Sequence, residues 1–147
     1  MLAEEAIAEL ALQRGGELWR RRDARRGSIV DGLAVDMARP RSAGAMVVGT
    51  VGGVVVGYGV SRIEVLEDGG RLAVVDDLFV RPGARGVGVG EAMMDLLVAH
   101  AVEQGALGID ALALPGDRAT KNFFETFGLK ARAIVVHRAL DGGDGRP

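Results

Sequence analysis

A glycine-rich run in the middle of the chain constrains the fold more than any other feature of the sequence. Residues 72–80 before it have apolar ends and an acidic middle, which predicts a strand. Residues 91–105 after it keep apolar side chains at helical spacing, which predicts a helix of about four turns ending at Gly105. The chain must therefore turn tightly between a strand and a helix. The run reads Arg81-Pro82-Gly83-Ala84-Arg85-Gly86-Val87-Gly88-Val89-Gly90-Glu91.

The start of such a helix is a favourable place for an anion. Its first N–H groups have no partner within the helix, and the helix dipole adds a partial positive charge. Glycine at positions 86, 88 and 90 keeps side chains away from the backbone, and Arg85 could add a direct charge contact. The run predicts a cradle for a diphosphate; the alternative is an ordinary tight turn.

Two common nucleotide-binding motifs fit this run poorly. A P-loop requires Gly-Lys-Ser/Thr, whereas Gly90 is followed by Glu91. A dinucleotide-binding unit places its glycines after the first strand of the domain and an acidic residue at the end of the next strand. Here a meander is expected first, and Asp110 lies near the beginning of its strand.

The remaining apolar patterns predict an α/β domain with a mixed sheet and helices on its faces. The helices and strands are expected to alternate after an initial meander of three antiparallel strands. The expected elements are a helix over 7–18 kinked near Gly15 and Gly16, a loop over 27–44 with one helical turn near Val35, strands at 46–48 and 54–58 around Gly52-Gly53, the strand 72–80, the helix 91–105, a strand at 108–114, a helix at 118–127, a strand at 131–140 and a disordered tail at 141–147.

Size and charge exclude several functional classes. A chain of 147 residues with 48% hydrophobic content is expected to form one domain, residues 1–147. Its net charge of -2 provides no general positive field for nucleic acid or an anionic membrane. The absence of cysteine removes thiolate metal sites and cysteine nucleophiles, and no metal is expected. No signal peptide or spanning segment is recognised, so a cytoplasmic location is expected.

Two motifs resemble those of the GNAT acetyltransferase superfamily. The strand and turn from Leu78 through Gly90 resemble its acyl-CoA-binding motif, R/Q-x-x-G-x-G/A, with Arg85, Gly88 and Gly90 at the defined positions. The stretch Asp117-Arg118-Ala119-Thr120-Lys121-Asn122-Phe123-Phe124-Glu125, followed by Gly128-Leu129, resembles the family's N-x-x-A-x-x-F-Y-E-x-x-G-F helix. The resemblance covers roughly residues 45–140. Residues 1–44 are less typical, because the family usually opens with a strand and none is evident before Leu10.

The resemblance implies a GNAT-like, mostly antiparallel, splayed sheet whose V-shaped gap admits the pantetheine arm of acetyl-CoA. It also implies an N-acetyltransferase in which an amine attacks the thioester directly. A backbone N–H near Leu78, Phe79 or Val80 would polarise the carbonyl. The other implied cofactor-binding residues are Arg85, Gly86, Val87, Gly88, Val89, Gly90 and Glu91 in the turn and Asp117, Lys121, Asn122 and Phe124 in the following motif.

Asp76 and Asp77 are the candidate general bases. Adjacent strand residues point to opposite faces, so one of the two should face the cleft, and Asp76 is favoured. Alternatively, one carboxylate is exposed and the other pairs with Arg62 or Arg71. A carboxylate could also simply bind the cationic amine acceptor.

The proton donor is where the sequence departs from the family. Phe124 stands where a tyrosine is usual and has no hydroxyl, and Asp117 replaces an asparagine. Tyr58 could reach the cleft, although a strand tyrosine is more often a packing residue. A water molecule could also serve, whereas His100 and His137 have no catalytic spacing.

Two alternatives to a simple enzyme remain. The departures at Phe124 and Asp117 would permit a non-catalytic acyl-CoA-binding or regulatory module. The arginine-rich stretch 20–26 could contact an acidic partner or a second copy of the chain in a homodimer, or could be a solvated helix face. Small amines, antibiotics and protein amines are all possible acceptors.

Overall fold

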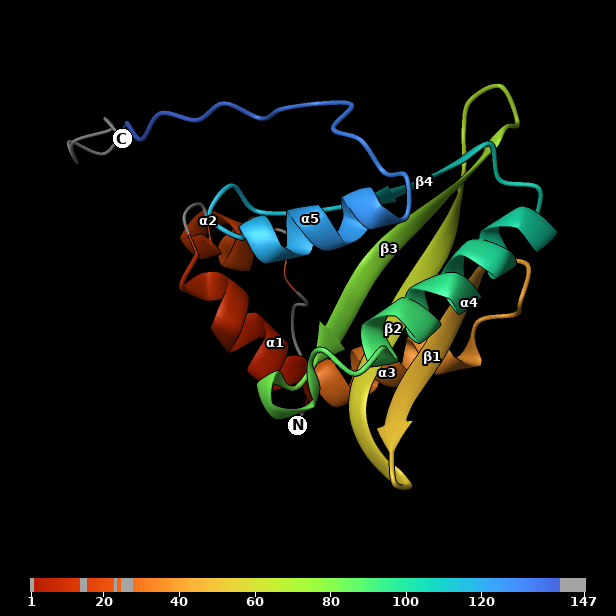
Figure 1. Ribbon diagram of the computed structural model, residues 1–147. Coiled ribbons are helices and arrows are strands. Elements are labelled where there is room, and N and C mark those ends of the chain that lie inside the picture. The colour runs from red at the N-terminus through yellow and green to blue at the C-terminus, as the bar shows by residue number, and fades with distance from the viewer. Residues whose placement is uncertain (1, 14–15, 23, 25–27, 141–147) are drawn as a thin grey trace.

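The structure is a computed structural model that describes residues 2–13, 16–22, 24 and 28–140. A four-stranded sheet in the order β1-β2-β3-β4 forms its centre, with helices on both faces (Figure 1). The elements are α1 (Leu2–Ala11), α2 (Gly16–Arg22), α3 (Ile29–Ala38), β1 (Gly44–Val51), β2 (Val54–Val65), β3 (Arg71–Val80), the 3-10 helix η1 (Pro82–Ala84), α4 (Val89–Glu103), β4 (Gly108–Ala111) and α5 (Arg118–Thr126).

The first three strands form the predicted antiparallel meander. β1 pairs with β2, and β2 pairs with β3. The turn between β1 and β2 has two residues, Gly52 and Gly53, with φ values of 56° and 80°. Two successive positive φ angles suit the twist of a hairpin and are easily adopted only by glycine.

The sheet is mixed and splayed between β3 and β4. β4 pairs in parallel with β3 only over Leu72–Val75, opposite Gly108–Ala111. β3 then continues to Val80 while β4 has already ended. The second half of β3 therefore has a strand partner on the β2 side alone, as expected for a V-shaped opening.

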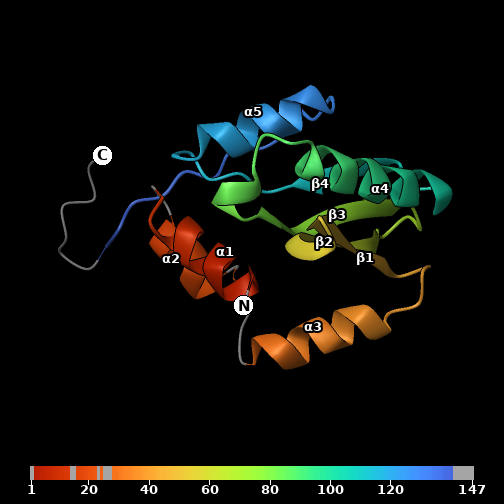
Figure 2. The same cartoon turned by 60° about the horizontal axis from the view of Figure 1, so that its bottom comes forward.

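Two apolar layers cover the sheet, one on each face (Figure 2). On the first face, Tyr58 and Phe79 pack with residues of α1 and α3, including Ala3 and Leu33. The second face carries α4 and α5, whose buried residues include Met94, Leu97 and Phe124. Both faces of the sheet are thus shielded, and β3 runs through the middle of the two layers.

The prediction of a loop over residues 27–44 is wrong, because α3 occupies Ile29–Ala38. Ser28 caps this helix: its side-chain oxygen accepts a hydrogen bond from the backbone N–H of Asp31 at 3.2 Å. Ile29 and Leu33 pack against the Tyr58 layer. The apolar pattern is difficult to recognise because Val30, Val35 and Met37 stay 63–70% exposed.

The prediction of a last strand over 131–140 is also wrong. Residues 129–140, termed here the carboxyl-terminal segment, have no regular secondary structure. β4 ends at Ala111 instead of Leu114. A strand needs a paired neighbour as well as a suitable sequence, and neither stretch has one here.

The expected kinked helix over 7–18 consists of two helices, α1 and α2. Gly15, at the expected kink, lies outside the described residues, as do Asp23, Arg25 and Arg26 of the arginine-rich stretch and the predicted tail 141–147. In the part of the chain that is described, no helix has both the length and the apolar character needed to cross a membrane.

Candidate functional site

The glycine-rich run forms the turn between β3 and α4. It begins with η1, in which the N–H of Ala84 donates to the carbonyl of Arg81 at 2.9 Å. Gly86 and Gly88 then adopt φ values of 85° and 87°, in the left-handed region. Gly88 is the N-cap of α4 and contributes no side-chain oxygen to it.

The backbone of residues 86–91, termed here the cradle, can receive an anion. The helical hydrogen bonds of α4 begin with the N–H of Ala92 donating to Gly88, so the preceding amides of the first turn have no acceptor within the helix. A Cβ placed at Gly86 or Gly88 would meet no atom within 4 Å. The two glycines therefore leave open space beside the turn, and the helix dipole favours negative charge there.

The remaining cradle residues differ in exposure. The side chain of Val87 is 67% exposed. Val89 and Gly90 are half-buried, and Glu91 is exposed. A Cβ at Gly90 would lie 3.4 Å from the ring of Phe123 in α5, so this ring packs against the beginning of α4. Phe123 is therefore the aromatic neighbour of the cradle, whereas the sequence predicted Phe124 in a cofactor-binding role.

Arg85 is held by α1 and β3. Its guanidinium donates to both carboxylate oxygens of Glu9 at 2.9 Å and, through Nε, to the carbonyl of Val80 at 2.7 Å. It also lies 5.5 Å from the ring centroid of Phe79. The direct contact between Arg85 and a phosphate stays a prediction, because this side chain already has several partners.

Arg81 makes a second ion pair with α1, to Glu5. It donates to Glu5 at 3.0 and 3.2 Å, and this interaction lowers the pKa of the Glu5 carboxyl. Glu5 and Glu9 are one helical turn apart, and Arg81 and Arg85 have the same spacing. This matched i, i+4 spacing is the signal that could have revealed that α1 braces the turn.

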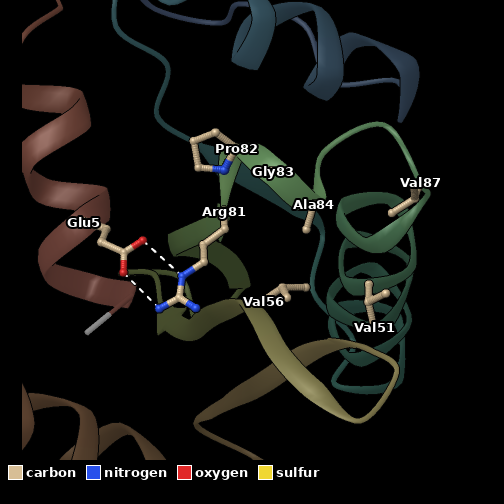
Figure 3. A pocket seen from close by; sticks show the side chains of 8 residues that line it. All are labelled: Glu5, Val51, Val56, Arg81, Pro82, Gly83, Ala84 and Val87. Atoms are coloured by element: carbon tan, nitrogen blue, oxygen red, sulfur yellow. Dashed lines mark hydrogen bonds and ion pairs between the residues drawn. The ribbon is translucent and has the colours of Figure 1, made fainter.

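A groove of about 490 Å³ adjoins the turn on the side of α1 and the hairpin. In Figure 3 the Glu5–Arg81 pair forms its polar wall, and aliphatic side chains from β1, β2 and the turn form the opposite wall. The lining residues are Glu5, Val51, Val56, Arg81, Pro82, Gly83, Ala84 and Val87.

The prediction that Asp76 and Asp77 face opposite ways is wrong. The pairing register of β3 skips Asp76: Asp77 lies opposite Val60 and Val75 lies opposite Ser61. This β-bulge lets two consecutive side chains share one face. Both carboxylates bond to side chains of the neighbouring strand, Asp76 to Arg62 at 3.2 Å and Asp77 to the Tyr58 hydroxyl at 2.6 Å.

The two carboxylates have different surroundings. Partial burial raises the pKa of Asp76, Arg62 opposes the shift, and the neighbouring Asp77 adds to it. The side chain of Asp76 is 31% exposed. Tyr58, which donates to Asp77, is only 5% exposed and belongs to the apolar layer beneath α1 and α3. Asp76 is therefore the more accessible of the two candidates.

Leu78, Phe79 and Val80, which follow the bulge in β3, have different environments. Leu78 packs in the layer beneath α4 and α5, and Phe79 is buried in the layer on the other face. Val80 presents its carbonyl to Arg85. All three lie in the half of β3 that β4 does not cover, so their backbone borders the V-shaped opening.

The α5 residues named by the second motif serve mainly local structure. Asp117 caps the helix by accepting from the N–H and the hydroxyl of Thr120, at 3.2 and 2.6 Å. Lys121 pairs with Glu125 at 3.4 Å, and Asn122 is exposed. Phe124 is 7% exposed and belongs to the core with Leu97. Phe124 thus packs in the core and has no hydroxyl with which to donate a proton, and its contact with the cofactor stays a prediction.

The two histidines of the chain lie in different environments. His100 is buried in α4 with Nε2 2.6 Å from the carbonyl oxygen of Arg41, and His137 is exposed in the carboxyl-terminal segment. Among the residues that the structure describes, no three His, Cys, Asp or Glu side chains gather as a metal site would require.

Solved structures with similar folds include several acetyltransferases. A transcriptional regulator from Bacillus halodurans C-125 has a TM-score of 0.68 and 19% identity, covering 94% of this chain and 93% of that chain. Glucosamine-6-phosphate N-acetyltransferase from Arabidopsis thaliana has a TM-score of 0.63 and 17% identity, with 92% of each chain covered. AAC(6')-Iy in complex with a CoA-S-monomethyl-acetylneamine bisubstrate analogue has a TM-score of 0.62 and 16% identity, covering 76% of this chain and 77% of that chain.

The sequence comparison identifies the family directly. A search of curated proteins found no match. The profile of the Acetyltransferase (GNAT) family matches residues 5–129, which include most of α1, the whole sheet, the cradle and α5. The splayed mixed sheet and the strand-turn-helix cradle agree with that match, and the chain belongs to the GNAT acetyltransferase family.

Proposed function

We propose that this protein transfers an acetyl group from acetyl-CoA to a primary amine of a small molecule or a protein. The observation that carries the proposal is the cradle at the start of α4, where Gly86 and Gly88 adopt the left-handed region and have open space at the position of a Cβ. Bound acetyl-CoA would supply the thioester that donates the acetyl group. AAC(6')-Iy has been crystallised with CoA and with a CoA-containing bisubstrate analogue, which supports this choice of donor.

The residues present fit a diphosphate and a pantetheine arm. The amides of residues 86–91 can donate to phosphate oxygens, and the dipole of the fifteen-residue helix α4 adds positive potential. Beside the cradle, β4 has ended and β3 continues through Leu78–Val80. In the proposed mechanism, an amide of this uncovered stretch would polarise the acetyl carbonyl.

The amine must lose a proton before or during its attack, and Asp76 is the proposed base. Its raised pKa makes the carboxylate a stronger proton acceptor, and its 31% exposure leaves room for a substrate amine. Arg62 holds one oxygen of Asp76. The carbon–sulfur bond breaks as the new carbon–nitrogen bond forms, and the leaving sulfur takes a proton from Tyr58 or water.

A second candidate function is acyl-CoA binding without efficient transfer. It is favoured because neither position considered for a proton-donating hydroxyl, 124 or 58, offers a free one. Phe124 is a core residue with no hydroxyl, and the Tyr58 hydroxyl is buried and already donates to Asp77. In this hypothesis the cradle binds CoA, and the hydrogen bond between Tyr58 and Asp77 stabilises the bulge and has no catalytic role.

Calorimetric titration with acetyl-CoA and CoA would test the cradle. Gly88→Trp should abolish binding, because the indole would cover the amides that hold the diphosphate. Gly69→Trp is the matched control: Gly69 also has a positive φ, 84°, and open space around it, but it lies in the turn between β2 and β3. Binding by the control and not by Gly88→Trp supports the proposal, whereas binding by neither the wild type nor the control contradicts it.

A thiol-release assay with an amine library would then separate the two functions. The chain contains no cysteine, so every thiol detected comes from CoA. Transfer that falls sharply in Asp76→Asn while CoA binding is retained supports the proposed base. CoA binding with no thiol release above the uncatalysed rate for any amine favours the binding module.

A further inference from the structure

Charged side chains cross the sheet beside the proposed base. In β2, Arg62 donates through Nε to Oδ1 of Asp76 at 3.2 Å and through Nη1 to Glu64 at 3.3 Å. Arg62 and Glu64 are two residues apart in one strand, so their side chains share a face of the sheet. The guanidinium of Arg62 is therefore held between two carboxylates, one on its own strand and one on β3.

A second arginine reaches the same place from α3. Arg39 is the C-cap of α3, and its guanidinium pairs with Asp36 at 3.0 Å. A Cβ placed at Gly44 would lie 3.2 Å from the Cδ of Arg39, so the missing side chain at position 44 leaves room for this arginine. Gly44 is the β1 partner of Arg62, and the charge of Arg39 acts on Asp76. Asp76 thus lies near two arginines, each of which is also paired with another carboxylate.

The surroundings of Asp76 have opposing effects on its carboxyl group. Burial raises the pKa and favours the neutral acid, and the neighbouring Asp77 adds to this effect. Arg62 lowers the pKa through its charge and its hydrogen bond, and Arg39 lowers it through its charge. Asp77 is itself held by the hydroxyl of Tyr58. The two arginines therefore favour the ionised form of Asp76, which is the form that can accept a proton.

The hydrogen bond from Arg62 also distinguishes the two oxygens of Asp76. Oδ1 accepts from Nε of Arg62, whereas Oδ2 accepts no hydrogen bond from the residues that the structure describes. The side chain of Asp76 is 31% exposed, so a substrate can approach the carboxylate. Of the two oxygens, Oδ2 is therefore the one available to an acceptor amine.

We propose that Arg62 is a positioning residue for Asp76: it holds Oδ1, keeps the carboxylate ionised and leaves Oδ2 to receive the proton of the acceptor amine. The inference rests on the proposed role of Asp76 as the base. As the amine nitrogen attacks the thioester, its proton moves to Oδ2 and Asp76 becomes neutral. Glu64 then balances the charge of Arg62, so the guanidinium keeps a carboxylate partner throughout the reaction.

Carbon-detected NMR titration of the side-chain carboxyl groups tests the inference without any substrate. Asp76→Asn identifies the signal of Asp76 by its loss. Arg62→Met should move the titration of Asp76 to higher pH, because less positive charge then opposes the effect of burial. Glu64→Gln should move it to lower pH, because Arg62 then has no second carboxylate to pair with when Asp76 is protonated.

Arg132→Met is the matched control for the loss of an arginine. Arg132 donates to Asp110 in β4 at 2.8 Å, and this hydrogen bond lowers the pKa of the Asp110 carboxyl. The control should move the titration of Asp110 to higher pH and leave that of Asp76 unchanged, whereas Arg62→Met should move Asp76 and leave Asp110. An unchanged Asp76 in Arg62→Met, or an equal shift of Asp76 in both variants, overturns the proposal.

The pH dependence of transfer tests the catalytic consequence, with an acceptor found in the thiol-release assay. The ratio of kcat/KM between variant and wild type removes the ionisation of the acceptor itself. For Arg62→Met this ratio should be at least about threefold lower at pH 6 than at pH 8, because kcat/KM reports the base of the free enzyme. Arg62→Lys keeps the positive charge and should recover most of the loss at pH 6.

The two measurements separate failure of this inference from failure of the proposed function. Transfer with a ratio that is the same at pH 6 and pH 8 overturns the positioning role of Arg62 and leaves the acetyltransferase proposal standing. A shift of Asp76 in the NMR titration without transfer to any amine contradicts the proposed function alone, because Arg62 then holds a carboxylate that no reaction uses.

Discussion

The junction between β3 and α4 and the carboxyl-terminal segment both lie at the surface of the molecule, but they are attached to it differently. The junction contacts α1, α5 and the hairpin, and two ion pairs to α1 hold its arginines. The carboxyl-terminal segment is attached to the rest of the molecule by Leu129 and the Arg132–Asp110 pair, and its apolar side chains face solvent. The junction thus has tertiary partners along its length, whereas the described part of the carboxyl-terminal segment has them mainly at its beginning.

The largest expected effect contrasts the carboxyl-terminal segment with the core beneath α4 and α5, in the cost of removing an apolar side chain. Phe124→Ala should lower the free energy of unfolding by about 3–5 kcal/mol, because it leaves a cavity in the core. Ile134→Ala should change it by less than about 0.5 kcal/mol in dilute solution, since Ile134 is exposed there. Urea denaturation measures both values.

The measured cost of Ile134→Ala shows whether the side chain has contacts within its own chain, because an exposed side chain loses none on truncation. A cost of several kcal/mol for Ile134→Ala in the monomer would mean that the segment is packed within its own chain.

The next effect concerns the backbone of the junction. Gly88→Ala should cost about 1–2 kcal/mol of stability, because a residue with a Cβ is strained at a φ of 87°. Gly83→Ala, in the same turn, lacks a positive φ and has open space around it, so its effect should be below about 0.5 kcal/mol. Thermal unfolding of the two variants provides the measurement, and equal costs would contradict the assigned backbone geometry.

A smaller effect is expected for the ion pair between Arg85 and Glu9. A double-mutant cycle with Arg85→Met and Glu9→Gln should give a coupling of about 0.2–1 kcal/mol, since both side chains are about two-fifths exposed. The coupling should weaken in high salt. A coupling of zero at low salt would mean that the Arg85–Glu9 pair does not help to hold α1 to the junction.

The smallest effects are expected in the pH dependence of stability, which should have opposite signs for the carboxylates of Asp76 in β3 and Asp110 in β4. The raised pKa of Asp76 gives stability that is complete below the unfolded value of about 3.9 and is lost as pH rises through the folded value. The lowered pKa of Asp110 gives stability that is present above about 3.9 and is lost as pH falls through the folded value.

Urea denaturation across this pH range tests both directions. Relative to the wild type, Asp76→Asn should gain stability as the pH rises from about 3 to 7, and Asp110→Asn should lose it. Parallel pH profiles for the two variants would contradict the environments assigned to these carboxylates.

Local sequence predicted well those elements whose interactions lie close together in the chain. The paired glycines specify the hairpin turn, and the glycine-rich run specifies the change from strand to helix. The α3 helix was missed because its exposed Val30, Val35 and Met37 obscure the apolar period, and its stability comes from the Ser28 cap and the packing of Leu33.

The candidate site was predictable in position but only partly in detail. The cradle lies where the family motif indicated, since backbone amides at a helix start need only the local chain. The partners of Arg85 and Arg81 come from α1, 76 residues earlier in the chain, and the matched four-residue spacing of the two glutamates and the two arginines is the one sequence signal of that contact. Asp76 and Asp77 share a face because the pairing register with β2 shifts beside them. An ideal strand would alternate their side chains, so the sequence alone predicted opposite faces.

The sequence by itself determined the meander, the strand-turn-helix cradle and the family, because glycine conformations, helix caps and apolar periods act over a few residues. Only the tertiary structure decided that α1 braces the turn, that a bulge places Asp76 beside Asp77, and that residues 131–140 are not a strand within this chain. These features depend on which distant segments meet. A residue's own propensity favours a conformation, but the partner across the sheet or the opposite charge in space determines whether that conformation is kept.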